Sequence, residues 1–211
     1  MAGLILATVG MLGAGVWFGA SRQRTAPKDV TTQLSEIQHV DNSAIAVGKP
    51  APQMTWKDAK SGKTVHLSDF RGKPVVLFFG SSTCPPFRLS TPRIDELRRT
   101  YEGRVNCFMI YSAEAHPNYA SQSYMKDAKT LEDRKRAARD LVAETNLSTN
   151  ILVDTMDNQA GQMCGTYPSR IFVLDAKGKI AYFSGQPSSM MTFPIKGILD
   201  RLLAAGNKNH T

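Results

Sequence analysis

The chain has few cysteines. Its 211 residues contain three, Cys84, Cys107 and Cys164, and no two of them are spaced C-x-x-C. A small, odd number of cysteines excludes a secreted domain that is held together by disulfides. The absence of a C-x-x-C pair argues against a structural zinc site, so no metal is expected. Any reactive cysteine in this chain therefore works alone, or with a distant or external thiol.

Charged residues are absent from residues 2–20. As a helix these residues would span roughly 28 Å, about one bilayer core. A cleaved signal peptide is the alternative, but the segment lacks a basic start, and Phe18 stands where a cleavage site needs a small residue. We therefore predict a single transmembrane anchor over residues 1–21. Basic residues follow it directly, which places the rest of the chain in the cytoplasm by the positive-inside rule.

Nucleic-acid motifs and aromatic-interleaved basic runs are also absent, so nucleic-acid binding is not expected. Residues 22–46 are polar, without periodicity and balanced in charge, which is typical of a tether. The net charge of +8 then belongs to a domain over residues 47–205 and a short tail at 206–211. That charge favours anionic ligands or a membrane surface.

Strand and helix patterns alternate along this domain. Buried or paired strands are predicted at 74–80, 105–111, 150–154, 171–175 and 179–184, and helices at 91–102, 131–144 and 193–204. The last two strands flank Ala-Lys-Gly at 176–178, which indicates a hairpin. Parallel strands joined by helices, followed by a hairpin and a helix, predict an α/β fold with a mixed central sheet flanked by helices.

Cys84 follows the first buried strand and precedes two prolines, which suit the first positions of a helix. At a helix N-terminus the positive end of the dipole would lower the pKa of the thiol. The hydroxyls of Ser81 and Thr83 could also bond the sulfur. A buried, unreactive thiol is the alternative. This strand–Cys–helix layout is similar to the thioredoxin superfamily, and Pro168 sits where that superfamily places a cis-proline facing the cysteine.

The position of the second thioredoxin cysteine is occupied by Phe87, which excludes the usual dithiol chemistry. Cys107 lies inside an apolar strand and is expected in the core. Cys164 precedes the Pro168 turn, and two interpretations stay open: it resolves a bond to Cys84, or it is a small packed side chain.

The sequence Tyr111-Ser112-Ala113-Glu114-Ala115-His116 follows the second buried strand. Ligands bind at this edge of an open α/β sheet. His116 can donate a proton near neutral pH, and Glu114 can hold its tautomer or its charge. The alternative for His116 is an ordinary solvent-exposed histidine.

Taken together, six segments carry a specific resemblance: VGKPAP at 47–52, FFGSSTCPPF at 78–87, IYSAEAHP at 110–117, LEDRKRAA at 131–138, ILVDTMDNQ at 151–159 and YPSRIFVLDAKGKI at 167–180. They resemble the iodothyronine deiodinase family, in a version with cysteine in place of selenocysteine. The resemblance implies a thioredoxin-like fold and thiol-dependent reductive removal of iodine from iodinated phenols. A membrane anchor and a homodimer are further implications.

The resemblance also assigns roles. Cys84 would be the nucleophile, and His116 with Glu114 would deliver a proton or bind the phenol, with Tyr111, Ser81 and Thr83 as neighbours. Arg170 would bind a substrate carboxylate or support that wall. No bound cofactor is implied, and an external thiol, either a dithiol or a small redox protein, would reset the oxidised cysteine.

Some residues depart from the family pattern. Ser82 replaces a cysteine, Cys164 replaces a tyrosine, and the segment between His116 and Leu131 is short. An iodothyronine as the substrate is therefore less firmly implied than the fold and the redox chemistry.

Two other functions stay open. Ser81-x-x-Cys84 and the strand pattern after Arg170 are similar to peroxiredoxin-like thiol peroxidases, although Leu77 stands where those enzymes have a proline. A membrane-tethered, non-enzymatic thiol-binding module is the other alternative.

Overall fold

The computed structural model describes residues 45–116, 127–165, 169–184 and 194–207. The expected anchor, residues 22–44 of the tether and Pro168 lie outside these ranges. Within the described ranges, no helix is long and apolar enough to cross a membrane.

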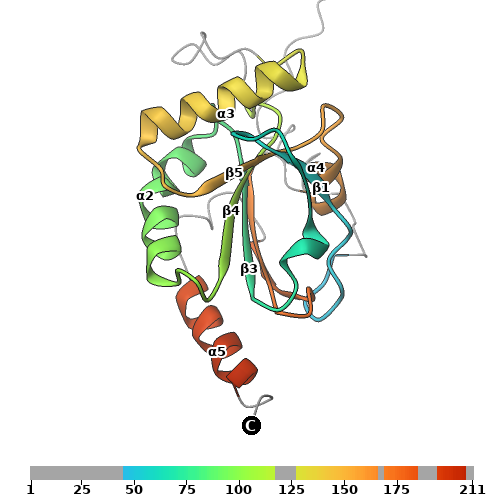
Figure 1. Cartoon of the computed structure of the whole chain (residues 1–211), viewed down its shortest axis with the longest axis vertical. Coiled ribbons are helices and arrows are strands. Elements are labelled where there is room, and N and C mark those ends of the chain that lie inside the picture. Colours follow the sequence, from blue (N-terminus) through green and yellow to red (C-terminus); the bar gives the residue numbers. More distant parts are fainter. Residues whose placement is uncertain (1–44, 117–126, 166–168, 185–193, 208–211) are drawn as a thin grey trace, which may run out of the picture. The chain divides into compact units, whose positions relative to one another are not determined.

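Seven strands of the described chain form one mixed sheet in the order β2-β1-β5-β4-β3-β6-β7 (Figure 1). The strands are β1 (Thr55–Asp58), β2 (Thr64–His66), β3 (Val75–Gly80), β4 (Asn106–Tyr111), β5 (Asn150–Val153), β6 (Arg170–Leu174) and β7 (Ile180–Phe183). Strand β4 runs parallel to both β3 and β5, whereas β6 is antiparallel to β3 and to β7. The predicted mixed sheet and its closing hairpin are confirmed.

Two apolar layers sandwich this sheet, because the strands bury side chains on both faces. One face of β3 presents Val76 and Phe78 to a core that includes α2 (Pro85–Thr100), α3 (Leu131–Thr145) and α5 (Ile195–Asn207). Its other face presents Leu77 and Phe79 to a core that includes Trp56, the 3-10 helix η1 (Leu67–Phe70) and the short helix α4 (Gln159–Cys164). The first pair of strands and α4 were not predicted from the sequence.

Helix α2 begins at Pro85, six residues before the predicted start, and continues past Pro92. Proline at position 92 cannot donate to the carbonyl of Arg88, four residues earlier. That carbonyl instead accepts from the hydroxyl of Thr91 at 2.8 Å. The side chain beside the proline thus replaces the missing backbone hydrogen bond, and Cys84 becomes the residue that caps an uninterrupted helix.

Candidate active site

The site lies where β3 and β4 end side by side. Gly80 and Tyr111 are partners in this parallel pair, so the segments that follow them leave the sheet at the same edge. A Cβ atom at Gly80 would lie 2.2 Å from the ring of Phe87, which is fully buried. Glycine therefore lets the first turn of α2 pack directly against the end of β3. Phe87, in the place of a second cysteine, is a core side chain.

Cys84 is the N-cap residue of α2, and its side chain is almost fully buried, with 1% of its surface exposed. Its thiol donates a hydrogen bond to Ser169 Oγ over 3.3 Å. Ser169 immediately precedes β6 and is also fully buried. The chain just after position 168 therefore faces the cysteine, although Pro168 itself lies outside the described residues.

Burial raises the pKa of the Cys84 thiol above 9.0, and the charge of Glu114 acts in the same direction. The hydrogen bonds with Ser169 and the Phe87 backbone oppose this effect without overcoming it. The expectation of a lowered pKa is therefore wrong for this conformation, because removing a thiolate from water costs more than the helix terminus returns. The hydroxyls of Ser81 and Thr83, which were expected to bond the sulfur, are engaged elsewhere.

Glu114 occupies the centre of a buried network, with 5% of its surface exposed. Its Oε2 accepts from both the amide and the hydroxyl of Thr83, at 2.9 and 2.7 Å. Its Oε1 accepts from the hydroxyl of Tyr111, which is also hydrogen bonded to Ser82 Oγ at 2.8 Å. Burial and the adjacent carboxylate raise the pKa of Tyr111, so the phenol keeps its proton.

Ser81 and Thr83 bind the backbone on the far side of Glu114. Ser81 Oγ accepts from the Ala115 amide and Thr83 Oγ1 accepts from the His116 amide, both at 3.0 Å. The predicted group of Cys84, Glu114, Tyr111, Ser81 and Thr83 is thus brought together. Ser82, noted in the sequence only as a departure from the family pattern, also contributes its hydroxyl to the network.

The remaining predicted residues lie outside the network around Glu114. His116 is exposed at the end of the segment that follows β4. Arg170 is half-buried, and its Nη1 donates to the Ser184 carbonyl over 3.3 Å, which ties β6 to the residue after β7. Cys107 is a buried core residue on β4, as predicted, and burial raises its pKa to about 12. Cys164 ends α4, and its side chain lies outside the description.

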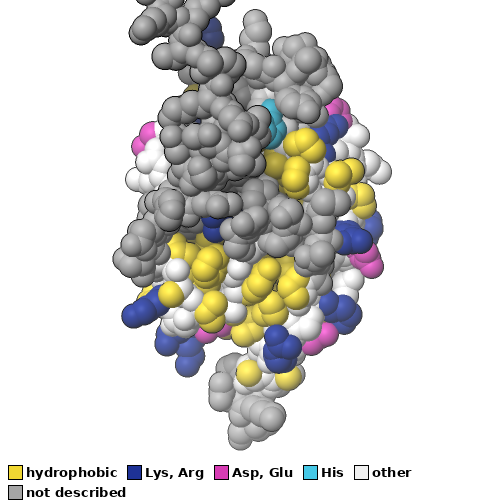
Figure 2. All heavy atoms as spheres, turned by 180° about the vertical axis from the view of Figure 1, so that it is seen from behind, with side chains coloured by type: hydrophobic (Ala, Val, Ile, Leu, Met, Phe, Trp, Pro, Cys, Tyr) yellow, Lys and Arg dark blue, Asp and Glu magenta, His cyan; other side chains and the backbone are white. Residues whose placement is uncertain are grey.

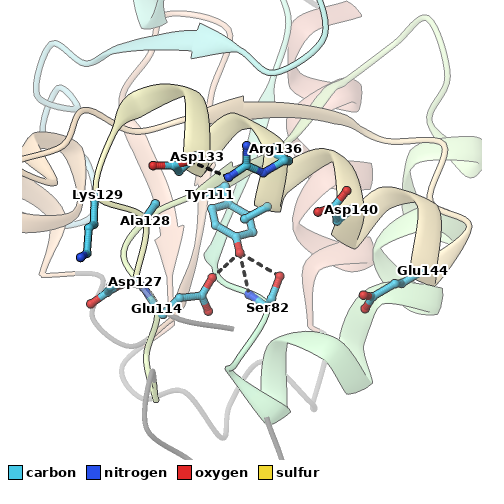
Figure 3. Close-up of a pocket in the computed structure, with 11 residues that line it drawn as sticks. Ser82, Tyr111, Glu114, Asp127, Ala128, Lys129, Asp133, Arg136, Asp140 and Glu144 are labelled. Carbon is cyan, nitrogen blue, oxygen red and sulfur yellow. Dashed lines mark hydrogen bonds and ion pairs between the residues drawn. The ribbon is translucent and has the colours of Figure 1, made fainter. Parts of the chain in front are cut away.

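A cavity of about 450 Å³ adjoins the network (Figure 3). Ser82, Tyr111 and Glu114 line one side of it, and α3 supplies another wall. The charged lining residues are mainly acidic, although the chain as a whole carries +8: Glu114, Asp127, Lys129, Asp133, Arg136, Asp140 and Glu144. In the described part of the chain, no cluster of His, Cys, Asp and Glu side chains could hold a metal ion.

The sequence model of the iodothyronine deiodinase family matches residues 30–202. The chain belongs to the iodothyronine deiodinase family. It is 31% identical over 156 residues to a type II iodothyronine deiodinase of Gallus gallus, covering 67% of this chain and 56% of that protein. It is 34% identical over 148 residues to a thyroxine 5-deiodinase of Gallus gallus, covering 66% and 56%. The chain thus spans little more than half the length of these relatives.

Solved structures agree on the fold of this deiodinase-family chain. The thioredoxin domain of a thiol-disulfide oxidoreductase from Bacteroides vulgatus matches with a TM-score of 0.52 and 19% identity, over 75% of this chain and 96% of that one. A secreted thiol-disulfide isomerase from Corynebacterium glutamicum matches with a TM-score of 0.54 and 18% identity, over 74% and 85%. At such identities the likeness concerns the fold alone, and the thioredoxin-like architecture expected from the sequence is confirmed.

Proposed function

We propose that this protein removes iodine reductively from iodinated phenols of the iodothyronine type, with Cys84 as the nucleophile and an external thiol as the reductant. One observation supports this most directly. The amide and the hydroxyl of Thr83, the residue before the cysteine, both donate to the carboxylate of Glu114, which also accepts a hydrogen bond from the hydroxyl of Tyr111. A soft nucleophile and a buried proton-carrying network therefore adjoin within one site. Family membership supplies the reaction class.

The proposed reaction balances as follows. The thiolate of Cys84 attacks iodine, an S–I bond forms, and the carbon–iodine bond breaks with its electron pair on the ring carbon. That carbon takes up a proton. A thiol then displaces iodide from sulfur to give a mixed disulfide, and a second thiol releases Cys84 as a thiol. The net result converts the aryl iodide and two thiols into the arene, iodide, a proton and one disulfide.

The buried thiol needs help to ionise, because its pKa is raised in the resting state. We propose that the thiol gives up this proton to the Glu114 network when substrate binds, and that the network returns a proton to the ring carbon after the carbon–iodine bond breaks. The Thr83 hydroxyl donates to Glu114 and accepts from the His116 backbone amide, so it contacts both residues that we propose for proton delivery. His116, at the exposed end, would exchange the proton with solvent.

The other roles follow from position. Ser82 and Tyr111 line the cavity beside the network and would contact the phenol ring. Arg170 donates to the Ser184 carbonyl, and we propose that its guanidinium binds a substrate carboxylate or supports that side of the site. Residues 1–21 would tether the domain to a membrane.

The test is a paired assay on the full chain with an iodinated phenol and dithiothreitol. Iodide release should require Cys84: Cys84→Ala should abolish it, and Cys107→Ala, which changes a buried residue of β4, should leave most of it. Peroxide turnover is measured on the same samples. Rapid peroxide reduction without iodide release would establish the peroxidase alternative. The positions of Ser81 and Thr83 disfavour that outcome, because both hydroxyls bind the 114–116 backbone or Glu114 rather than the sulfur.

A further inference from the structure

The segment that carries Glu114 is held by side chains at four consecutive amides. The four amides donate to side-chain oxygens from three parts of the chain: Ala113 to Asn158 at 3.0 Å, Glu114 to Asp127 at 2.8 Å, Ala115 to Ser81 at 3.0 Å and His116 to Thr83 at 3.0 Å. Ser81 and Thr83 belong to the cysteine segment itself. Asn158 instead links the site to the segment after β5, where α4 begins.

Asn158 is itself held in place by Arg134, a residue of α3 with 3% of its surface exposed. The Arg134 guanidinium donates through Nη1 to Asn158 Oδ1 at 2.9 Å and to the Thr155 carbonyl at 2.5 Å. Two donors, Arg134 and the Ala113 amide, therefore converge on one side-chain oxygen. A side-chain acceptor at this place satisfies both donors at once, and its loss would leave the buried Arg134 without one of its partners.

The backbone of Asn158 explains why this residue type serves. Its φ of 53° lies in the left-handed region, where asparagine, aspartate and glycine are the residues most readily accommodated. It is the N-cap residue of α4, yet its side chain makes no capping hydrogen bond to that helix. The side chain is thus not needed to begin α4, and its described contacts point to the segment after β4.

We propose that Asn158, oriented by Arg134, is a positioning residue that fixes the Ala113–His116 segment and thereby holds Glu114 against Thr83 and the cysteine. The contacts run from α3 through Arg134 to Asn158, then to Ala113 and Glu114, and finally to Thr83. Arg134 and Asn158 belong to the segments LEDR and DTMDN, and in this proposal both act on Cys84 through the residues between them. This inference deepens the proposed function. Only the iodide assay depends on that function, and the positioning role itself does not.

Asn158→Gly and Asn158→Asp form the decisive pair. Glycine keeps the left-handed backbone but removes the acceptor, whereas aspartate keeps both. Asn158→Gly should lower the kcat of iodide release roughly tenfold, about the effect of one lost hydrogen bond, and Asn158→Asp should restore most of the activity. The exposed neighbour provides a matched control, because Asp157→Asn changes a side chain of the same turn and should behave like the wild type.

A second measurement needs no substrate. The charge of Glu114 raises the pKa of Cys84, so displacing Glu114 should move the pH profile of Cys84 alkylation by iodoacetamide to lower pH. Asn158→Gly should show this shift in the full chain, followed by mass spectrometry of the Cys84 peptide. The shift should vanish when Asn158→Gly is made in a Glu114→Gln background, because the charge is already gone.

The outcomes separate the two proposals. If the wild type releases no iodide, the proposed function fails, and the alkylation profiles still decide the positioning role. If Asn158→Gly has the wild-type profile, or if Asn158→Asp shifts it equally, Asn158 is not a positioning residue. A shift that persists unchanged in the Glu114→Gln background would overturn the inference as well.

Discussion

Thr83 and Glu114 are joined by two hydrogen bonds, because the amide and the hydroxyl of Thr83 both donate to the same carboxylate oxygen. The two residues are 31 positions apart and follow different strands of the sheet. Since both strands end at one edge, this pair couples the residue before Cys84 to the segment that bears His116. A change in the charge of Glu114 should therefore be felt at the cysteine.

Glu114→Gln should speed the alkylation of Cys84 but slow iodide release. Loss of the carboxylate removes a negative charge that raises the thiol pKa, so alkylation at neutral pH should become faster. Loss of a proton carrier should slow iodide release roughly 100-fold, the lower range for general acid–base catalysis. Rates of iodoacetamide labelling and of iodide release are compared with those of Glu102→Gln, an exposed surface control. A slower labelling rate would contradict the assigned direction.

Ser169→Ala should move the reactivity of Cys84 in the reverse direction. The Ser169 hydroxyl can donate to the thiolate once the proton has left, so this contact lowers the thiol pKa, and its removal leaves burial and Glu114 opposed by the Phe87 backbone alone. The alkylation profile should shift to higher pH, and labelling at neutral pH should slow several-fold. Ser68→Ala, at an exposed position of η1, serves as the control. An unchanged profile would show that the hydroxyl does not act on the sulfur.

Much of the fold could be predicted from local patterns. The run from Val75 to Gly80 is apolar at nearly every position, which marks a strand buried on both faces, and the structure places it between β4 and β6. Strands β1 and β2 were missed because they are short, at four and three residues, and carry mixed polar side chains. Helix α4 has only six residues, too few for a helical period to emerge.

The site was predictable in membership but not in electrostatics. Cys84, Glu114 and Tyr111 follow neighbouring strands, so their proximity follows from topology. The pKa of the thiol depends on burial by segments distant in the sequence. No local pattern predicts that Ser169, 85 positions away, is hydrogen bonded to the sulfur. The role of Asn158 could not be predicted either, because its contact with Ala113 spans 45 positions.

Gly80→Ala should destabilise the fold by about 1–3 kcal/mol, the usual cost of overpacking a core. The added methyl group would lie 2.2 Å from the Phe87 ring, and both elements that carry the two residues are tightly packed. Urea unfolding gives the comparison. Phe87→Leu in the same chain should offset part of the loss, so the double variant should be more stable than the sum of the single changes predicts. Strict additivity would contradict the close approach.

A glycine control is available on α5. A Cβ atom at Gly197 would meet only the end of the Arg201 side chain, at 3.7 Å, which is ordinary contact. Gly197→Ala should therefore stabilise the helix by up to about 1 kcal/mol. Opposite signs at the two glycines would separate the steric effect at Gly80 from any general effect of the substitution.

Cys107 should make the fold less stable in alkaline solution. Its pKa is raised from 9.0 to about 12 by burial, so the unfolded chain loses this proton at lower pH than the folded chain does. The contribution is complete below pH 9 and is lost as the pH rises towards 12, by about 4 kcal/mol over the whole window. At pH 10 the loss is about 1.4 kcal/mol. Urea unfolding of the wild type and Cys107→Ala under reducing conditions, at pH 8 and pH 10, measures the difference. The variant loses a core contact at both pH values, so it should start less stable and decline less; parallel declines would show that Cys107 ionises as easily in the folded chain as in the unfolded one.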